Sequence, residues 1–171
     1  MDCKILVLAE QEEGALRDTS FELLGMAHRL AGEAGWEASD IKALGLGQGI
    51  DNLAEKLAKG GASEAIYAEG TAVENYTSDA YGKAIEAVVR EESPEVLLMS
   101  HTPNGWDLAP LVAGGLEVPI ATGCSNVTFE DGNVRFHRKA FNGKFVHVVE
   151  IDATPKMATV DKGAASPLEN P

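Results

Sequence analysis

The side chains best suited to chemistry lie in residues 101–107, which read His-Thr-Pro-Asn-Gly-Trp-Asp and follow a short apolar run at 96–100. In an open parallel sheet, ligands bind where strands end, so hydroxyl, amide and imidazole groups at this point can hold a nucleotide. The sequence has no Lys or Arg between residues 91 and 134. A phosphate bound there would therefore depend on backbone N–H groups and a helix dipole. We expect a helix to follow, with Asp107 near its first turn and Pro110 just inside it, ending at about residue 113.

Five residues are candidates for lining a single nucleotide cleft at these strand ends. They are Ala9 after the first expected strand, and Ser100, Thr102, Asn104 and Gly105 around the fourth. Glu10 would join them in an adenosine pocket. Glu12 and Glu13 follow closely, and three carboxylates beside one crevice would repel a phosphate.

The familiar catalytic signatures are missing from the sequence. Gly45-Leu46-Gly47-Gln48-Gly49 lacks the G-x-G-x-x-G spacing, so we interpret it as a strand-to-helix turn. There is no P-loop and no G-x-S-x-G elbow, and no Ser or Asp stands at a spacing that makes His101 part of a triad. His137 and His147 are expected to face each other across a hairpin, which alone is a weak metal site. We predict no catalytic residue and no metal site, so the chain is not expected to be an enzyme.

The overall composition is that of an acidic globular domain. The 171 residues carry a net charge of -13, which disfavours binding to nucleic acid and to anionic membranes. Only two cysteines occur, and they do not form a C-x-x-C pair. The sequence has no apolar run of transmembrane length and no signal-peptide pattern, so we expect a cytoplasmic protein without membrane insertion.

Strands and helices are expected to alternate through most of the chain. Apolar runs predict strands at 5–9, 41–46, 65–68, 96–100 and 119–121. Helices are predicted from a capping box at Thr19–Glu22 to Gly35, from Asp51 to Lys59, and over 77–91. Strands at 126–129, 134–137 and 145–151 then follow without helices, and a last edge strand is expected at 156–160. This order predicts an α/β fold: a mostly parallel sheet with helices on both faces, plus an antiparallel C-terminal extension.

The hairpin region carries the only basic cluster of the sequence, formed by Arg135, Arg138, Lys139 and Lys144. These residues can form either a solvated ribbon face or a docking surface for a partner protein, since charged rims set orientation and association rate. We keep Arg135, Arg138 and Lys139 as candidate partner contacts.

A family resemblance rests on several segments that occur in order. They are Ile5–Glu10, Thr19–Leu24, Gly105-Trp106-Asp107-Leu108-Ala109-Pro110, Val118-Pro119 and Pro155–Val160. Together they resemble the amino-terminal domain of the electron transfer flavoprotein α subunit. The resemblance covers about residues 1–160, and residues 161–171 are expected to be a linker or tail. Where family members often carry basic residues, this chain has Trp106 and Leu111, so Trp106 becomes a further candidate partner contact.

The resemblance implies a fold related to the adenine nucleotide α-hydrolases and a scaffold role beside a β subunit. FAD would belong to the complete heterodimer and would be held mainly by a second domain, so the cleft here would be a vestigial nucleotide site. Dehydrogenases would be partners through the complete complex. A stand-alone adenine-nucleotide-binding module similar to universal stress proteins is the alternative. An amidohydrolase or adenylating enzyme would need a nucleophile or pyrophosphate loop that we do not find.

Overall fold

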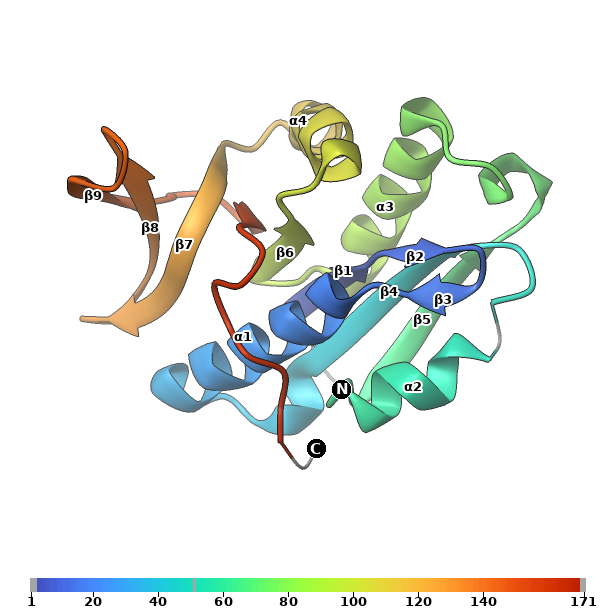
Figure 1. The fold of residues 1–171 in the computed structure, drawn as a ribbon, viewed down its shortest axis with the longest axis horizontal. Coiled ribbons are helices and arrows are strands. Elements are labelled where there is room, and N and C mark those ends of the chain that lie inside the picture. The colour runs from blue at the N-terminus through green and yellow to red at the C-terminus, as the bar shows by residue number, and fades with distance from the viewer. Residues whose placement is uncertain (1–2, 51, 170–171) are drawn as a thin grey trace.

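The computed structural model of the protein describes residues 3–50 and 52–169 (Figure 1). A mixed eight-stranded sheet forms its centre. Its strands are β1 (Ile5–Ala9), β4 (Ile41–Gly47), β5 (Glu64–Glu69), β6 (Val96–Ser100), β7 (Ile120–Glu130), β8 (Asn133–Ala140), β9 (Phe145–Glu150) and β10 (Lys156–Val160). They lie in the order β5-β4-β1-β6-β10-β7-β8-β9. The six strands from β5 to β7 are parallel, and β8 and β9 add an antiparallel ribbon. The short strands β2 (Gln11–Glu12) and β3 (Ala15–Leu16) pair separately.

In the part of the chain that the structure describes, four helices cover the two faces of this sheet. They are α1 (Asp18–Ala34), α2 (Leu53–Lys59), α3 (Ser78–Glu92) and α4 (Pro103–Leu116), with short 3-10 turns at Ala38–Asp40 and Thr71–Val73. Apolar side chains of α1 and α2 share one core with the sheet, and those of α3 and α4 share the other. The predicted α/β architecture is therefore confirmed. Asp51, the expected first residue of the second helix, lies outside the described residues.

Two predicted helix starts are wrong. Helix α1 begins at Asp18, so Thr19 lies inside its first turn and does not cap it. The reason is the neighbouring Ser20, whose hydroxyl accepts a hydrogen bond from the Glu10 N–H (2.9 Å) and donates one to the Glu10 carbonyl (3.0 Å). Helix α4 begins at Pro103, where a missing N–H costs nothing, and Asp107 and Pro110 consequently lie further inside it than expected.

The carboxyl-terminal third of the sheet also differs from the prediction. The expected strands at 119–121 and 126–129 are parts of one long strand, β7. Strand β10 does not lie at an edge, because it pairs in parallel with β6 on one side and β7 on the other. Its side chains from Met157 to Val160 are buried accordingly.

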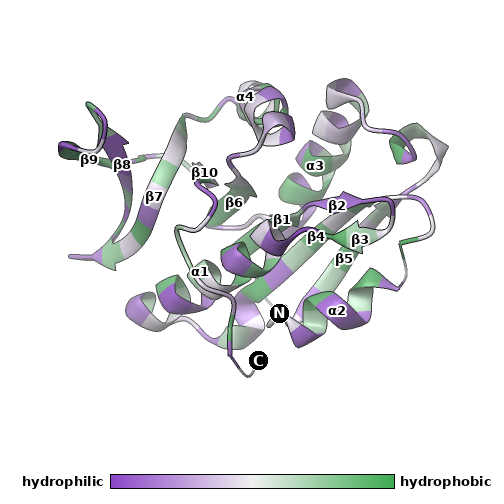
Figure 2. Cartoon of the chain, in the orientation of Figure 1, coloured by the Kyte–Doolittle hydropathy of each residue, from purple (hydrophilic) through white to green (hydrophobic). Residues whose placement is uncertain are grey.

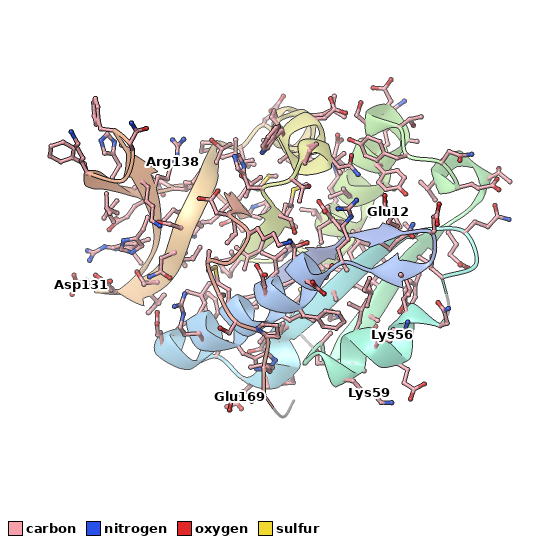
Figure 3. The ribbon with its side chains drawn as sticks, viewed as in Figure 1. Glu12, Lys56, Lys59, Asp131, Arg138 and Glu169 are labelled. Atoms are coloured by element: carbon pink, nitrogen blue, oxygen red, sulfur yellow. The ribbon has the colours of Figure 1, made fainter. Side chains whose placement is uncertain are left out.

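Residues after β10 lie along helix α1. The Gly163 N–H donates to the Glu22 carboxylate (2.6 Å), and Ala164 and Ala165 pack against the core. Helix α1 has Gly25 where this tail crosses it, and a Cβ on that glycine would lie 2.0 Å from the Ser166 carbonyl oxygen. Figure 3 shows Glu169 beyond α1, at the end of this tail. The division of the chain at residue 160 stays a prediction, and residues 170 and 171 lie outside the described part.

Hydrophobic residues are not confined to the two cores. Figure 2 shows hydrophobic stretches on β9, at the outer edge of the sheet. Among the described residues, no helix combines the length and the hydrophobicity needed to cross a bilayer.

Candidate functional site

The candidate cleft lies at the carboxyl ends of β1, β4 and β6. The chain leaves β1 toward β4 on one side and later returns to place β6 on the other, so the strand order reverses beside β1. Such a reversal opens a crevice in which α/β proteins bind ligands. Here the crevice is a cavity of about 50 Å³. Its lining residues are Leu8, Ala9, Glu10, Gln11, Leu46, Tyr76, Tyr81, Asn104 and Leu108.

A hydrogen bond between two side chains joins Glu10, which lines this crevice, to Thr102. The Thr102 hydroxyl donates to Oε1 of Glu10 (2.6 Å) and also accepts a hydrogen bond from the Gly105 N–H (3.1 Å), which caps helix α4. Burial raises the pKa of the Glu10 carboxyl, while the Thr102 hydroxyl and the nearby Arg17 act in the opposite direction. The polar groups of Glu10 and Thr102 are thus already hydrogen-bonded within the protein.

Ser100 and Gly105 are packing residues rather than lining residues of this cavity. Ser100 is only 1% exposed, and its hydroxyl has no hydrogen-bond partner within the described part of the chain. A Cβ on Gly105 would lie 1.9 Å from the Ser100 carbonyl oxygen, so glycine allows α4 to begin directly against the end of β6. Of the five predicted cleft residues, the structure brings together Ala9 and Asn104, with Thr102 behind them.

A second depression lies at the carboxyl ends of β6 and β10, beside Thr122 of β7, and has a volume of about 270 Å³. Gly105 lines it together with His101 and Trp106. The His101 ring lies 5.5 Å from the Trp106 ring, and its Nδ1 is hydrogen-bonded to the hydroxyl of buried Thr159 (2.9 Å). Trp106 is 56% exposed, so the predicted partner contact presents an aromatic surface beside this depression.

Two tyrosines of the cleft were missed in the sequence analysis. Tyr76 donates a hydrogen bond to the Asp107 carboxylate (2.9 Å), and burial together with this bond raises the pKa of Tyr76 to about 12. Tyr81 packs edge-on against Tyr76, with ring centroids 5.0 Å apart. Their position near the start of the predicted helix at 77–91 was the available signal, because that helix start faces the same sheet edge.

The predicted basic cluster divides into a paired and an unpaired part. Arg135 forms ion pairs with Glu130 (2.7 Å), Asp131 (3.0 Å) and Glu150 (2.8 Å), so acids of the same ribbon neutralise it. Arg138 and Lys139 are exposed, and no ion pair joins either of them to an acid among the residues described. Figure 3 shows Arg138 on β8 and Asp131 at the β7–β8 turn.

The expected pairing of His137 with His147 is wrong. Strand register places Arg138 opposite His147 and Val148 opposite His137, so the two imidazoles point to opposite faces of the ribbon. His137 Nε2 is instead hydrogen-bonded to the Thr128 hydroxyl (2.8 Å). Within residues 3–50 and 52–169, no group of three or more His, Cys, Asp or Glu side chains is arranged to hold a metal ion.

Comparison with known proteins points to one family. Residues 5–171 match the family model described as the electron transfer flavoprotein domain. The chain is 35% identical over 159 residues to the electron transfer flavoprotein subunit alpha of Megasphaera elsdenii, covering 91% of this chain and 46% of that protein. It is 32% identical over 161 residues to the corresponding subunit of Thermoanaerobacterium thermosaccharolyticum, covering 93% and 48%.

A third relative carries a more specific name. The chain is 32% identical over 190 residues to the acryloyl-CoA reductase electron transfer subunit beta of Anaerotignum propionicum, covering 96% of this chain and 51% of that protein. The chain thus spans about half the length of the curated relatives it matches.

Proposed function

Because this chain belongs to the electron transfer flavoprotein family, we propose that it is the amino-terminal domain of an α subunit and acts as a scaffold. In this role it binds the β subunit and supports electron transfer through FAD, without redox chemistry of its own. The relatives' names describe electron transfer components. Dehydrogenases or reductases are then partners of the complete complex, which we expect to work in the cytoplasm without nucleic acid.

The observation that carries the scaffold role is the size of the cleft. Pockets that hold cofactor-sized molecules have volumes of roughly 300–1,000 Å³. The cavity at the ends of β1 and β6 has about 50 Å³, and the wider depression of about 670 Å³ that shares Gln11, Tyr76, Tyr81 and Asn104 with it is open and acidic. Glu10, which lines this cavity, is already hydrogen-bonded to Thr102, so an adenosine group would have to displace a half-buried carboxyl. We therefore expect FAD to be held elsewhere in the complete heterodimer.

The charges around the cleft support the same conclusion. The pyrophosphate of FAD carries two negative charges and needs cations or several backbone donors. Arg17 is the nearest basic residue along the rim, and it is paired with Glu12 (2.9 Å) in a wider depression that Glu13 and Glu74 also line. An acidic rim of this kind repels a dinucleotide.

The scaffold role can be tested with two binding measurements on the 171-residue chain. Fluorescence titration with FAD should show no stoichiometric flavin retention by the chain alone. Mixing with the electron transfer flavoprotein β subunit of the same organism should give a one-to-one complex in light scattering. Tight flavin binding by the chain alone, or failure to bind the β subunit, would contradict the proposal.

The stand-alone adenine-nucleotide module remains the alternative, and calorimetry distinguishes it. Micromolar binding of AMP or ATP to the isolated chain would favour that module over the scaffold. Helix α4 begins at the end of β6 and offers its first N–H groups to an anion, but Thr102 already accepts one of them. We therefore expect no heat of binding with either nucleotide.

A further inference from the structure

The sequence contains the dipeptide Asn-Gly twice, and the two copies lie in different surroundings. Asn104-Gly105 belongs to the first turn of α4, whereas Asn142-Gly143 lies in the turn between β8 and β9. The backbone nitrogen of a glycine can approach the side-chain carbonyl of a preceding asparagine, because glycine has no Cβ and adopts conformations closed to other residues. The surroundings of each copy decide whether this approach is possible.

The copy between β8 and β9 is open to solvent. All residues from 141 to 150 are exposed, and Figure 1 shows β8 and β9 at one end of the sheet, away from α2 and α3. Among the described residues, a Cβ on Gly143 would have no atom within 4 Å apart from its chain neighbours. The side chain of Asn142 and the backbone of Gly143 can therefore move toward each other without meeting the rest of the domain.

The backbone of this turn is also strained. Phe141, Asn142 and Gly143 have φ values of 52°, 57° and 81°, so two residues other than glycine are held in the left-handed region. The turn is closed by hydrogen bonds from the Gly143 N–H to the Ala140 carbonyl (3.1 Å) and from the Lys144 N–H to the Phe141 carbonyl (3.3 Å). Opening these bonds relieves the strain and frees the Gly143 nitrogen, while both hydrophobic cores stay intact.

The copy in α4 is held closed by its contacts. The Gly105 N–H donates to the Thr102 hydroxyl (3.1 Å), and a Cβ on Gly105 would lie 1.9 Å from the Ser100 carbonyl oxygen. Gly105 is buried against the end of β6, so its nitrogen cannot turn toward the Asn104 side chain unless α4 unwinds. The same dipeptide thus occurs in the same chain in a form that the fold protects.

Cations accompany the exposed copy. Lys144 follows it directly, and Arg138 and Lys139 precede it on β8. All three are exposed, and none of them forms an ion pair with an acid in residues 3–50 and 52–169. Nearby positive charge stabilises the anion that forms when a nitrogen adds to the side-chain carbonyl, and it stabilises a carboxylate product.

We propose that Asn142 is a deamidation site, at which the chain modifies itself with water as the co-reactant. The Gly143 backbone nitrogen gives its proton to hydroxide and forms a bond to Cγ of Asn142. The Cγ–Nδ2 bond breaks, and ammonia leaves. Water then opens the resulting succinimide ring at either carbonyl, which gives aspartate or isoaspartate at position 142. The net reaction consumes water and releases ammonia, and it involves no oxidant or reductant.

The modification changes both the charge and the length of the turn. The new carboxylate adds one negative charge to a net charge of -13, and it lies among the three cations Arg138, Lys139 and Lys144. In the isoaspartate form the side-chain methylene carbon joins the backbone, so the turn is longer. The pairing of Ala140 with Phe145, which borders the turn, then has to adjust.

Incubation of the 171-residue chain in mildly alkaline buffer, followed by tryptic peptide mapping, tests this proposal. Trypsin releases residues 140–144 as a short peptide that contains Asn142. Mass spectrometry detects the exchange of the amide for a carboxyl group, and isoaspartyl methyltransferase labels the isoaspartate form. We expect Asn142 to convert at a rate proportional to the hydroxide concentration, while Asn104 keeps its amide in the folded chain. In urea both asparagines should convert, because the fold no longer protects Asn104.

Variants test the chemistry and the role of the cations separately. Asn142→Gln keeps an amide but would need a larger ring, so position 142 should stay unmodified. Lys139→Gln with Lys144→Gln should slow the conversion of Asn142 by about two- to fivefold, the size expected for exposed charges. The matched control is Lys56→Gln with Lys59→Gln on α2, well away from Arg138 in Figure 3, and it should leave the rate unchanged.

Two results would overturn the proposal. If Asn142 keeps its amide in the folded chain, the turn protects it and the site does not exist. If Asn104 converts as fast as Asn142 in the folded chain, the dipeptide alone sets the rate and the fold selects nothing. An unchanged rate in the Lys139 and Lys144 variant would show that the cations take no part in the reaction. Circular dichroism confirms that each variant is folded.

Discussion

The Thr102 hydroxyl lies 2.6 Å from Oε1 of Glu10, although 92 positions separate the two residues in the sequence. This hydrogen bond joins the end of β1 to the start of α4, and the same hydroxyl accepts from the Gly105 N–H. One side chain therefore both caps a helix and donates a hydrogen bond to a half-buried carboxyl. Its loss should affect two elements at once.

Replacing Thr102 with Val tests this double role. The variant loses the helix cap and leaves the half-buried Glu10 carboxyl without its donor, so it should lower the free energy of unfolding by about 1–3 kcal/mol. The matched control is Thr77→Val, because Thr77 caps α3 by accepting from the Ala80 N–H and has no buried carboxyl to serve. The control should cost about 1 kcal/mol or less. Equal losses in urea unfolding would show that the Glu10 contact contributes nothing.

Glu10 itself should make stability depend on pH. Burial raises the pKa of its carboxyl in the folded protein, so the folded state holds its proton at pH values where the unfolded chain has released it. The neutral Glu10 carboxyl favours the folded state, and this contribution to the free energy of unfolding is lost as the pH rises through the folded pKa. Glu10→Gln removes the titration, and the variant should be more stable than wild type at pH 7. The difference should vanish below about pH 4.3, where the carboxyl is neutral in both states. Urea unfolding between pH 4 and pH 8 measures this, and a constant difference across the range would contradict it.

Lys42 connects three elements from a buried position. Its ammonium group bonds to Glu64 of β5 (2.8 Å) and Glu92 of α3 (2.7 Å), and these hydrogen bonds raise the pKa of Lys42. Lys42→Met should cost roughly 3 kcal/mol, since it leaves the half-buried Glu92 carboxylate without its cation. The control Lys59→Met removes a pair with Glu55 in which both side chains are exposed. That control should lower the free energy of unfolding by less than about 1 kcal/mol. Similar losses of unfolding free energy in Lys42→Met and Lys59→Met would contradict this prediction.

The tail that follows β10 can be released by a single methyl group. Gly25→Ala places a Cβ against the Ser166 carbonyl, and the tail must shift. We expect a loss of about 1–3 kcal/mol and faster proteolysis of residues 161–169. Gly32→Ala, in the same helix with open space around it, should stabilise the protein by about 0.5–1 kcal/mol. Identical behaviour of the two variants would show that the tail does not contact α1.

The sequence predicted the architecture well because buried parallel strands are nearly continuous apolar runs. Val96–Ser100 is such a run, and all five residues are buried. The same signal correctly predicted the strand Phe145–Glu150, but there every residue is exposed. A hydrophobic pattern predicts where a strand forms, but it does not show whether the same domain buries that strand. The position of β10 was missed because strand order in space does not follow order in the sequence.

The candidate site was less predictable than the fold. Ser100, Thr102 and Gly105 were correctly placed at a strand end, but only the three-dimensional structure shows that Gly105 and Ser100 pack against each other. The capping-box prediction at Thr19 failed because the Ser20 hydroxyl bonds to the distant Glu10 backbone. Contacts of this length depend on tertiary packing, which local propensity does not encode.

The position of β10 between β6 and β7 also governs how the chain can fold during synthesis. Neither neighbour can complete its ladder until residues 156–160 have left the ribosome, because the missing strand belongs to the middle of the sheet. A nascent chain with 150 residues exposed therefore still has an open seam through its core. The domain must close late, and until then its half-formed sheet exposes apolar surface and unpaired strand edges.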